Sequence, residues 1–242
     1  ANTTASNNTA VGYFALLANT TGSENTAVGV TALDANTTGD DNVGMGYGAL
    51  GANTTGDKNV AIGNNALIAN TTASNNTAVG TNALLTNTTG SLNASFGGDT
   101  LKVNTTGAQN VAVGMYALNA NTTAGQNTAV GYTALLANTT GAYNVAVGEG
   151  ALYSNVDGSR SVAIGRLALY TQDPASAVDM YNVGIGYDAG GKITTGIQNT
   201  FVGGLAGDAT DDGTNNVAVG FEALSANCGS GNVALGTRAG KA

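Results

Sequence analysis

Few residues of this chain are of the kinds that carry out acid–base, nucleophilic or metal chemistry. The sequence has no histidine, the commonest general base and a frequent metal ligand. Its one cysteine, Cys228, therefore has no imidazole partner to activate it, and it cannot form an internal disulfide. The 15 Asp and Glu residues are scattered, as at Asp34, Asp57, Asp99 and Glu149, so clustered catalytic carboxylates are not predicted. We expect a protein that is not an enzyme and has no cofactor.

Two short segments and the cysteine are weaker candidates for a site. Asp208, Asp211 and Asp212 could form a loose calcium site, although their spacing does not match an EF-hand loop and a solvated acidic turn is the alternative. Gly46–Gly51, GYGALG, matches the dinucleotide pattern GxGxxG, but no strand–helix context follows it. We interpret Cys228 as a small buried thiol, with an intermolecular bridge as the alternative.

Asparagine followed by two threonines recurs along the chain, and each copy satisfies the acceptor pattern for N-glycosylation. The acceptor residues would be Asn2, Asn19, Asn36, Asn53, Asn70, Asn87, Asn104, Asn121 and Asn138. Duplicated turn chemistry also explains them, because Asn and Thr side chains hydrogen-bond their own backbone in turns. Rows of threonine could also bind ice or carbohydrate, but two adjacent threonines cannot both face one side of a strand.

These segments belong to one repeat, N-(T/V)-A-(V/I)-G-x-x-A-L-x-A-N-T-T-G-x-x, whose positions are numbered 1 to 17 below. The glycine of position 5 recurs at a constant step of 17 from Gly12 to Gly165, then at steps of 21, 17, 17 and 16 up to Gly236. Repetition at a fixed period is the signature of a solenoid or an array. The extra residues, around Gln172–Tyr181, should leave the repeat as a loop.

The first five positions alternate as in a strand, which places positions 2 and 4 on one face and positions 3 and 5 on the other. Position 4 is apolar in every copy, so we expect it to point inward, together with the leucine of position 9. Position 3 is mostly Ala or Gly, and such a face permits a close neighbour, either in the same coil or in another chain. The possible interface residues are Ala10, Ala27, Ala61, Ala78, Ala112, Ala129, Ala146 and Ala163.

Stacking of the repeats predicts an all-β fold, a parallel β-solenoid (β-roll) of about fourteen 17-residue coils. Position 1 is Asn in 13 of 14 copies, and stacked Asn side chains form amide hydrogen-bond ladders. The ALxANTTG segment is expected to be a turn, because no apolar stripe of helical period persists there. We predict regular repeats over residues 1–165, a repeat with a loop insertion over 166–186, and a less regular continuation of the solenoid over 187–242.

The composition disfavours some classes of partner for this chain. A net charge of −8 disfavours nucleic acid, and no apolar run is long enough for membrane insertion. Each coil buries only about three large apolar groups, so we expect partner chains to add apolar contacts. The first residues, ANTTASNN, and the last, TRAGKA, would together make about one unit. The chain is therefore expected to be cut from a longer array or to stack end to end.

The segments NTAVG, NVAVG and SVAIG (Ser161–Gly165) resemble the head repeats of trimeric autotransporter adhesins. The longer phrase NTAVGYxALxANTTG, as in Asn127–Gly141, and NTFVGGLAG (Asn199–Gly207) are similar to repeat shafts of phage tail fibres. The adhesin heads are trimeric left-handed β-rolls whose repeat is shorter than the one in this chain. The resemblance covers nearly all 242 residues and implies a trimeric fibre located outside the cell, on its surface or on a virion.

The function expected from this resemblance is that of a structural or adhesive fibre segment, a tail-fibre-like shaft or adhesin head that spaces or presents receptor-binding surfaces. Its partners would be other copies of itself and a host-surface glycan or protein. The alternative is a self-polymerising extracellular filament subunit. A glycan-active or ice-binding solenoid is less favoured.

Overall fold

The computed structural model describes residues 3–240, and within them it contains strands and turns but no helix. The chain divides into two compact units, Ala1–Thr123 and Ala124–Ala242. In each unit, every coil is one repeat long and contributes one short strand, and the strands pair in parallel. The predicted all-β parallel solenoid is confirmed.

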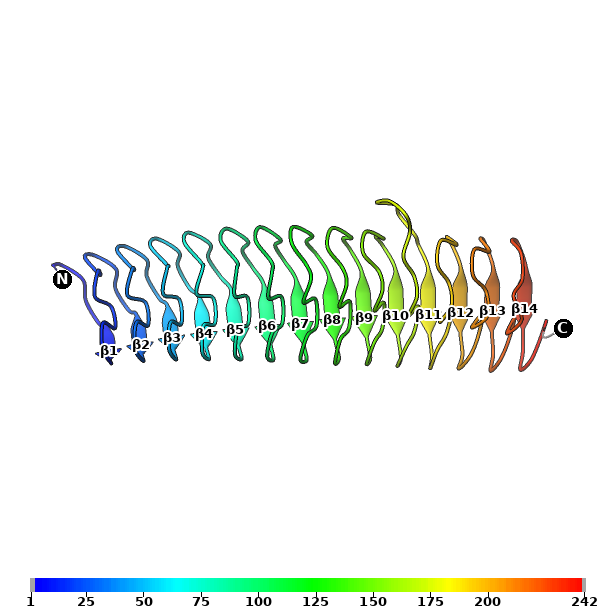
Figure 1. The fold of residues 1–242 in the computed structure, drawn as a ribbon, viewed down its shortest axis with the longest axis horizontal. Coiled ribbons are helices and arrows are strands. Elements are labelled where there is room, and N and C mark those ends of the chain that lie inside the picture. The colour runs from blue at the N-terminus through cyan, green and yellow to red at the C-terminus, as the bar shows by residue number, and fades with distance from the viewer. Residues whose placement is uncertain (1–2, 241–242) are drawn as a thin grey trace. The chain divides into compact units, whose positions relative to one another are not determined.

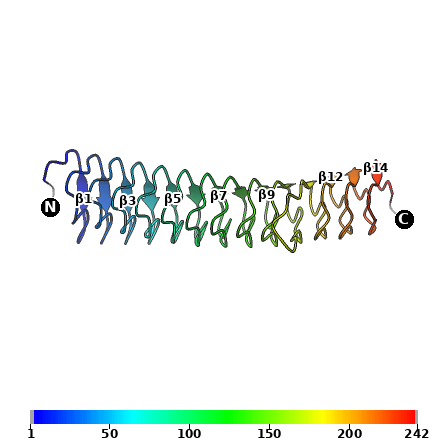
Figure 2. The same cartoon turned by 90° about the horizontal axis from the view of Figure 1, so that it is seen from above.

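The strands of each unit follow one another in sequence order, as Figures 1 and 2 show. The first unit contains β1 (Thr9–Val11), β2 (Thr26–Val28), β3 (Val43–Met45), β4 (Val60–Ile62), β5 (Thr77–Val79), β6 (Ala94–Phe96) and β7 (Val111–Val113). The second contains β8 (Thr128–Val130), β9 (Val145–Val147), β10 (Val162–Ile164), β11 (Val183–Ile185), β12 (Thr200–Val202), β13 (Val217–Val219) and β14 (Val233–Leu235). The register follows the repeat, since Ala61 pairs with Ala78 and Ala146 with Ala163.

Glycine at position 5 ends each strand and lets the coils stack. Gly63 has a φ of 139°, a conformation that residues with a Cβ rarely adopt. A Cβ on Gly63 would also lie 2.5 Å from the carbonyl oxygen of Gly80 in the next coil. Both the backbone angle and the contact between coils therefore require glycine at this position.

The leucine of position 9 forms the predicted core ladder, and it does so in an unusual backbone conformation. Leu67 is fully buried and has a φ of 52°, in the left-handed region that costs an L-residue about 1–2 kcal/mol. Its N–H donates to the carbonyl of Ala83 in the next coil at 3.0 Å. The same coil has two further residues of positive φ, Asn65 at 55° and Asn75 at 61°. These residues turn the chain sharply enough to close a coil within a single repeat.

The alanines of positions 3 and 8 fill the rest of the narrow interior. Ala61 and Ala66 have no exposed surface, whereas Ile62 at position 4 of the same coil is 39% exposed. The prediction that position 4 points inward is therefore wrong. The reason is space, because a Cβ built on Gly44, the position 3 residue of β3, lies only 3.3 Å from Cγ of Leu33. Alternating side chains point to opposite faces of the strand. The leucine leaves room inside the coil only for the face that carries the smaller side chains.

Two ladders of buried asparagine run beside this core. At position 1, Asn59 donates from Nδ2 to the carbonyl of Ala73 at 2.8 Å and accepts at Oδ1 from the N–H of Asn76 at 3.0 Å. At position 12, Asn70 donates to Oδ1 of Asn53 at 2.8 Å and to the carbonyl of Ala73 at 3.0 Å. The amide ladder predicted at position 1 is confirmed, and position 12 adds a second one.

In two coils, two buried positions change residue type together. In the coil of β10, Ser161 replaces the asparagine of position 1 and Gln172 that of position 12. The longer Gln172 reaches across to the hydroxyl of Ser161 at 3.1 Å and keeps the ladder contact to Oδ1 of Asn155 at 3.0 Å. In the coil of β6, Ser95 and Thr100 replace two core alanines, and their hydroxyl groups hydrogen-bond each other.

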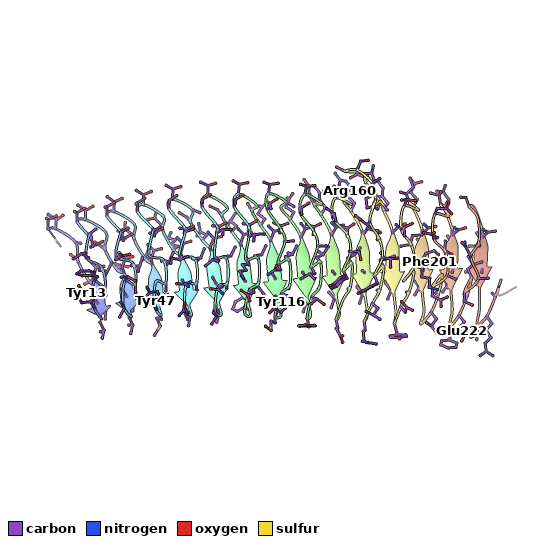
Figure 3. All side chains as sticks on the ribbon, viewed as in Figure 1. Tyr13, Tyr47, Tyr116, Arg160, Phe201 and Glu222 are labelled. Atoms are coloured by element: carbon purple, nitrogen blue, oxygen red, sulfur yellow. The ribbon has the colours of Figure 1, made fainter. Side chains whose placement is uncertain are left out.

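A third paired change fills the core of the second unit. Gly190 and Gly207 stand at position 9, where other coils have leucine, and Phe201 stands at position 3 in place of alanine. Phe201 is fully buried and lies on β12 in Figure 3. A Cβ on Gly207 would lie 2.6 Å from its Cδ1, and one on Gly190 would lie 2.7 Å from its Cδ2. One ring therefore occupies the space of two leucine side chains.

The insertion leaves the solenoid as the sequence predicts. In Figure 1 the yellow-green loop between β10 and β11 extends beyond the turns of the neighbouring coils. Its ends are anchored by the fully buried Gln172 and Met180, while Ala175–Asp179 are exposed. Met180 donates its N–H to the carbonyl of Ser159 at 2.9 Å, which returns the chain to the stack.

Candidate functional site

In each unit, the outer face of the strands is an exposed apolar surface. Positions 2 and 4 of the strands point outward, and they carry only Thr, Val, Ala, Ile, Met, Phe and Leu, with no charged residue in any coil. Several of these side chains are well exposed, including Met45 at 40%, Phe96 at 42% and Ile164 at 39%. Contiguous exposed apolar surface of this kind marks an interaction site on most proteins.

The predicted alanine interface lies on the opposite side of the strands and is wrong for this fold. Seven of the eight alanines have no exposed surface within the single chain; they are Ala27, Ala61, Ala78, Ala112, Ala129, Ala146 and Ala163. Ala10, in β1, is exposed. An alanine face packed against the leucine ladder of its own coil cannot contact another chain. Small residues at position 3, taken with leucine at position 9, were the signal that the interior is narrow.

The turn edge beside the insertion carries a second group of exposed side chains, the edge cluster, formed by Tyr143, Arg160, Asp179 and Tyr181. The guanidinium of Arg160 lies 4.6 Å from the ring centroid of Tyr143, and its Nε is 2.9 Å from Oδ1 of Asp179. The hydroxyl of Tyr181 donates to Oδ2 of Asp179 at 3.2 Å. Figure 3 places Arg160 at the edge from which the insertion loop projects. The two tyrosines are 48% and 50% exposed.

Sequence reasoning did not identify the edge cluster, although the repeat contains the signal for it. Tyr143, Arg160 and Tyr181 all occupy position 17, so stacking brings them together next to the insertion. A hollow of about 350 Å³ lies beside the cluster and is lined by Ser159, Ala177, Val178 and Asp179. The cluster therefore combines aromatic, cationic and anionic groups, all held by one another, on the rim of a shallow depression.

The predicted glycosylation sites are internal parts of the solenoid. The asparagines from Asn36 to Asn138 in that set are fully buried, and Asn19 is 2% exposed. Asn36, for example, donates from Nδ2 to Oδ1 of Asn19 at 2.8 Å and to the carbonyl of Gly39 at 3.0 Å. A glycan on these amides is incompatible with the folded coil, so the turn-chemistry interpretation applies. Asn2 lies outside the described residues.

The three acidic residues considered for calcium do not form a site. Among residues 3–240, no group of three His, Cys, Asp or Glu side chains is arranged to hold a metal ion. Asp211 instead accepts a hydrogen bond from the hydroxyl of Thr194, and Asp212 is exposed. A groove of about 470 Å³ next to them is lined by Thr171, Lys192, Thr194, Ala209, Asp211 and Asn227.

The carboxylate of Asp208 interacts with two other carboxylates, those of Asp188 and Glu222. Burial raises the pKa of Asp208, and the carboxylates of Asp188 and Glu222 raise it further, while Lys192 opposes the shift. Its Oδ1 is buried without a hydrogen-bond partner among the described residues. Burial likewise raises the pKa of Asp188 and, in the first unit, that of Asp34. These groups hold protons more readily in the folded chain than in the unfolded one.

Cys228 is only half-buried, so the expectation of a buried thiol is not met in full. Its Sγ lies 3.3 Å from Oγ1 of Thr210 in the preceding coil. That contact replaces the asparagine ladder, which Ile193 and Thr210 interrupt at position 12.

Comparisons with protein families, with curated proteins and with solved structures find no match to this chain. No helix in residues 3–240 is long and apolar enough to cross a bilayer.

Proposed function

We propose that this chain is a structural and adhesive fibre segment, similar in role to the tail-fibre shafts and adhesin heads that its repeats resemble. In this proposal the coils form a scaffold outside the cell, on a cell surface or on a virion. Their outer surfaces space and present contacts to a receptor, which is a host-surface glycan or protein.

The observation that supports the proposal is the contrast between the inside and the outside of the coil. The interior repeats the same alanine, leucine and asparagine ladders, and several of its changes are paired, as for Ser161 and Gln172. The residues that vary freely between coils stand at positions 6, 7, 10, 16 and 17. A constant interior with a variable exterior is what a presenting scaffold requires, since binding residues commonly lie on surfaces held by a rigid framework.

The edge cluster is the part of this surface that we assign to receptor contact. It stands at the one inserted loop and combines tyrosine with arginine, the residue types that dominate binding hot spots. Its side chains hold one another in place through the contacts to Asp179. Little side-chain entropy is then lost when a partner binds.

The test is a binding screen of the labelled protein against host-surface polysaccharides and proteins, with product analysis on every polysaccharide. We expect binding without cleavage, and at least a tenfold loss of affinity, or about 1.4 kcal/mol, for a Tyr143→Ala/Tyr181→Ala variant. Tyr153→Ala is the matched control, because that ring stacks on Tyr170 at 4.9 Å, away from the cluster. Turnover of a polysaccharide, or equal loss in the control, would contradict the proposal.

The alternative of a self-polymerising filament has a separate readout. Particles that lengthen with protein concentration at constant width in electron micrographs would favour a filament subunit. Particles of fixed length would favour the fibre segment.

A further inference from the structure

The outer sheet face of the first unit carries two rows of strand residues, at positions 2 and 4 of β1–β7, and a third row of exposed turn residues, at position 6, borders them. None of the residues in these rows is charged. In the coil of β3, the rows contain Val43, Met45 and Tyr47, and the last two are 40% and 57% exposed. The same rows continue to Val111, which is 38% exposed, in β7.

The charges of the first unit lie elsewhere on each coil. They occupy positions 7, 10, 16 and 17, at Glu24, Asp34, Asp40, Asp41, Asp57, Lys58, Asp99 and Lys102. A chain with a net charge of −8 repels its own copies. The outer sheet face is where two copies can meet without burying a carboxylate, and burying an unpaired charge is strongly unfavourable.

The face is large enough for a modest contact. Seven strands about 4.8 Å apart and two strand rows about 6.6 Å apart span roughly 29 Å by 7 Å between Cα atoms. With the width of the side chains this is roughly 400 Å² on each copy, or about 800 Å² for a pair, in the range of weak interfaces, and the exposed turn residues of position 6 add to it.

The shape of the face favours a second copy over an unrelated partner. Its ridges repeat once per coil, and only a surface with the same spacing can interdigitate with all of them, as paired sheets of identical side chains do. Large and small side chains alternate on the face, which allows such interdigitation. In the coil of β6, Phe96 at 42% exposure stands between Ala94 and Gly98, the two smallest residues of their rows.

We infer that the outer sheet face of the first unit docks against the same face of a second copy of this chain, sheet to sheet. The inference deepens the proposed fibre function, on which it rests, by identifying the surface through which copies associate side by side. It replaces the alanine face as the site of self-association.

The test is the solution mass of two paired variants. In Ile62→Lys/Val113→Lys, two exposed apolar residues of the face, 39% and 37% exposed, become cationic. We expect the wild type to have a multiple of 23.6 kDa and this variant to have 23.6 kDa. The matched control, Thr72→Lys/Thr89→Lys, adds the same charge at exposed positions of the turn edge and should keep the wild-type mass. Circular dichroism of each variant checks that the fold is retained.

A cross-link locates the contact independently of any change in charge. In a Cys228→Ser background, Val79→Cys places a thiol on the face, and mild oxidation should give covalent pairs. Thr72→Cys should not give them. A wild type of 23.6 kDa at all concentrations, a face variant of unchanged mass, or equal cross-linking at both thiols would overturn the inference. The fibre proposal fails separately, if the particles are globular in electron micrographs or bind no receptor.

Discussion

The buried leucine of position 9 stabilises each coil through its side chain and destabilises it through its backbone conformation. Leu84 has a φ of 52° and no exposed surface. Its left-handed backbone costs about 1–2 kcal/mol, and its side chain fills most of the apolar interior. The conformation is maintained by packing, so the side chain and not the local propensity determines whether the coil closes.

We predict that Leu84→Ala lowers the free energy of unfolding by about 2–5 kcal/mol, the usual range for emptying a core leucine site. Leu92→Ala is the matched control, since Leu92 is 54% exposed and also has a positive φ, of 63°. That change should stay within about 0.5 kcal/mol of the wild type. Urea unfolding measures both, and a similar loss in the two variants would contradict the assignment of the core.

Asp208 predicts a dependence of stability on pH. Its pKa is raised in the folded chain, first by burial and then by Asp188. The folded state then binds more protons than the unfolded state, so the contribution of this group to stability is greatest below the ordinary pKa of an Asp, about 3.9, and is lost as the pH rises through the raised pKa. The side chain as a whole is only partly buried, so the effect is small.

Asp208→Asn should therefore raise the melting temperature at pH 7 by about 1–3 °C and reduce the difference between about pH 4 and pH 7. Asp212→Asn removes one charge from an exposed position in the same turn region and serves as the control. Differential scanning calorimetry at the two pH values measures both. Equal shifts would attribute the effect to net charge alone.

At the scale of the element, the coils of β11 and β12 exchange two leucines for one phenylalanine. Gly190 and Gly207 have φ values of 61° and 62°, close to the 49° of Leu169 at the same repeat position. Their backbone can therefore accept leucine, but an added Cβ would meet the ring of Phe201 and, at Gly190, also Cδ2 of Leu169 at 2.8 Å. The exchange is a matter of volume, not of backbone geometry.

Phe201→Ala alone should lower the free energy of unfolding by about 3–5 kcal/mol. Gly190→Leu/Gly207→Leu alone should also destabilise the chain, because the new side chains overlap the ring. Together the three substitutions restore the common coil, and we expect most of the stability to return. Thermal unfolding of the set measures this. Additive losses would show that the ring does not fill both sites.

For the whole molecule, a coil that contacts only its neighbours can be removed as a block. Deleting residues 59–75 removes one complete coil of the first unit and brings like positions together. We expect the circular dichroism spectrum of a β-solenoid and a melting temperature lower by no more than about 5 °C. Deleting residues 59–67 instead removes β4 and its leucine but leaves the turn. That variant should unfold at a much lower temperature, and similar melting of the two would contradict stacking as the source of stability.

The repeat period was enough to predict the architecture, because a constant repeat length determines parallel stacking, the leucine ladder and the ladder of Asn59 and its equivalents. It was not enough to orient the strand. Position 4 is more apolar than position 3, and burial of the larger apolar residue is the usual expectation. Here Leu67 already fills the interior, so Ala61 turns inward and Ile62 outward. The edge cluster depends on contacts such as that of Arg160 with Asp179 across the insertion, which no local pattern encodes.

The paired replacements have a consequence for how the chain folds. A chain of near-identical segments gives each strand several almost equivalent partners, and a strand that skips a neighbour would still find matching Asn and Leu. Phe201 of β12 packs against Gly190 of the preceding coil, where a leucine would overlap its ring. This pair therefore disfavours an alignment in which a strand skips its neighbour. The irregular positions of the second unit thus help to specify which strands pair, whereas the regular positions would fit several alignments equally well.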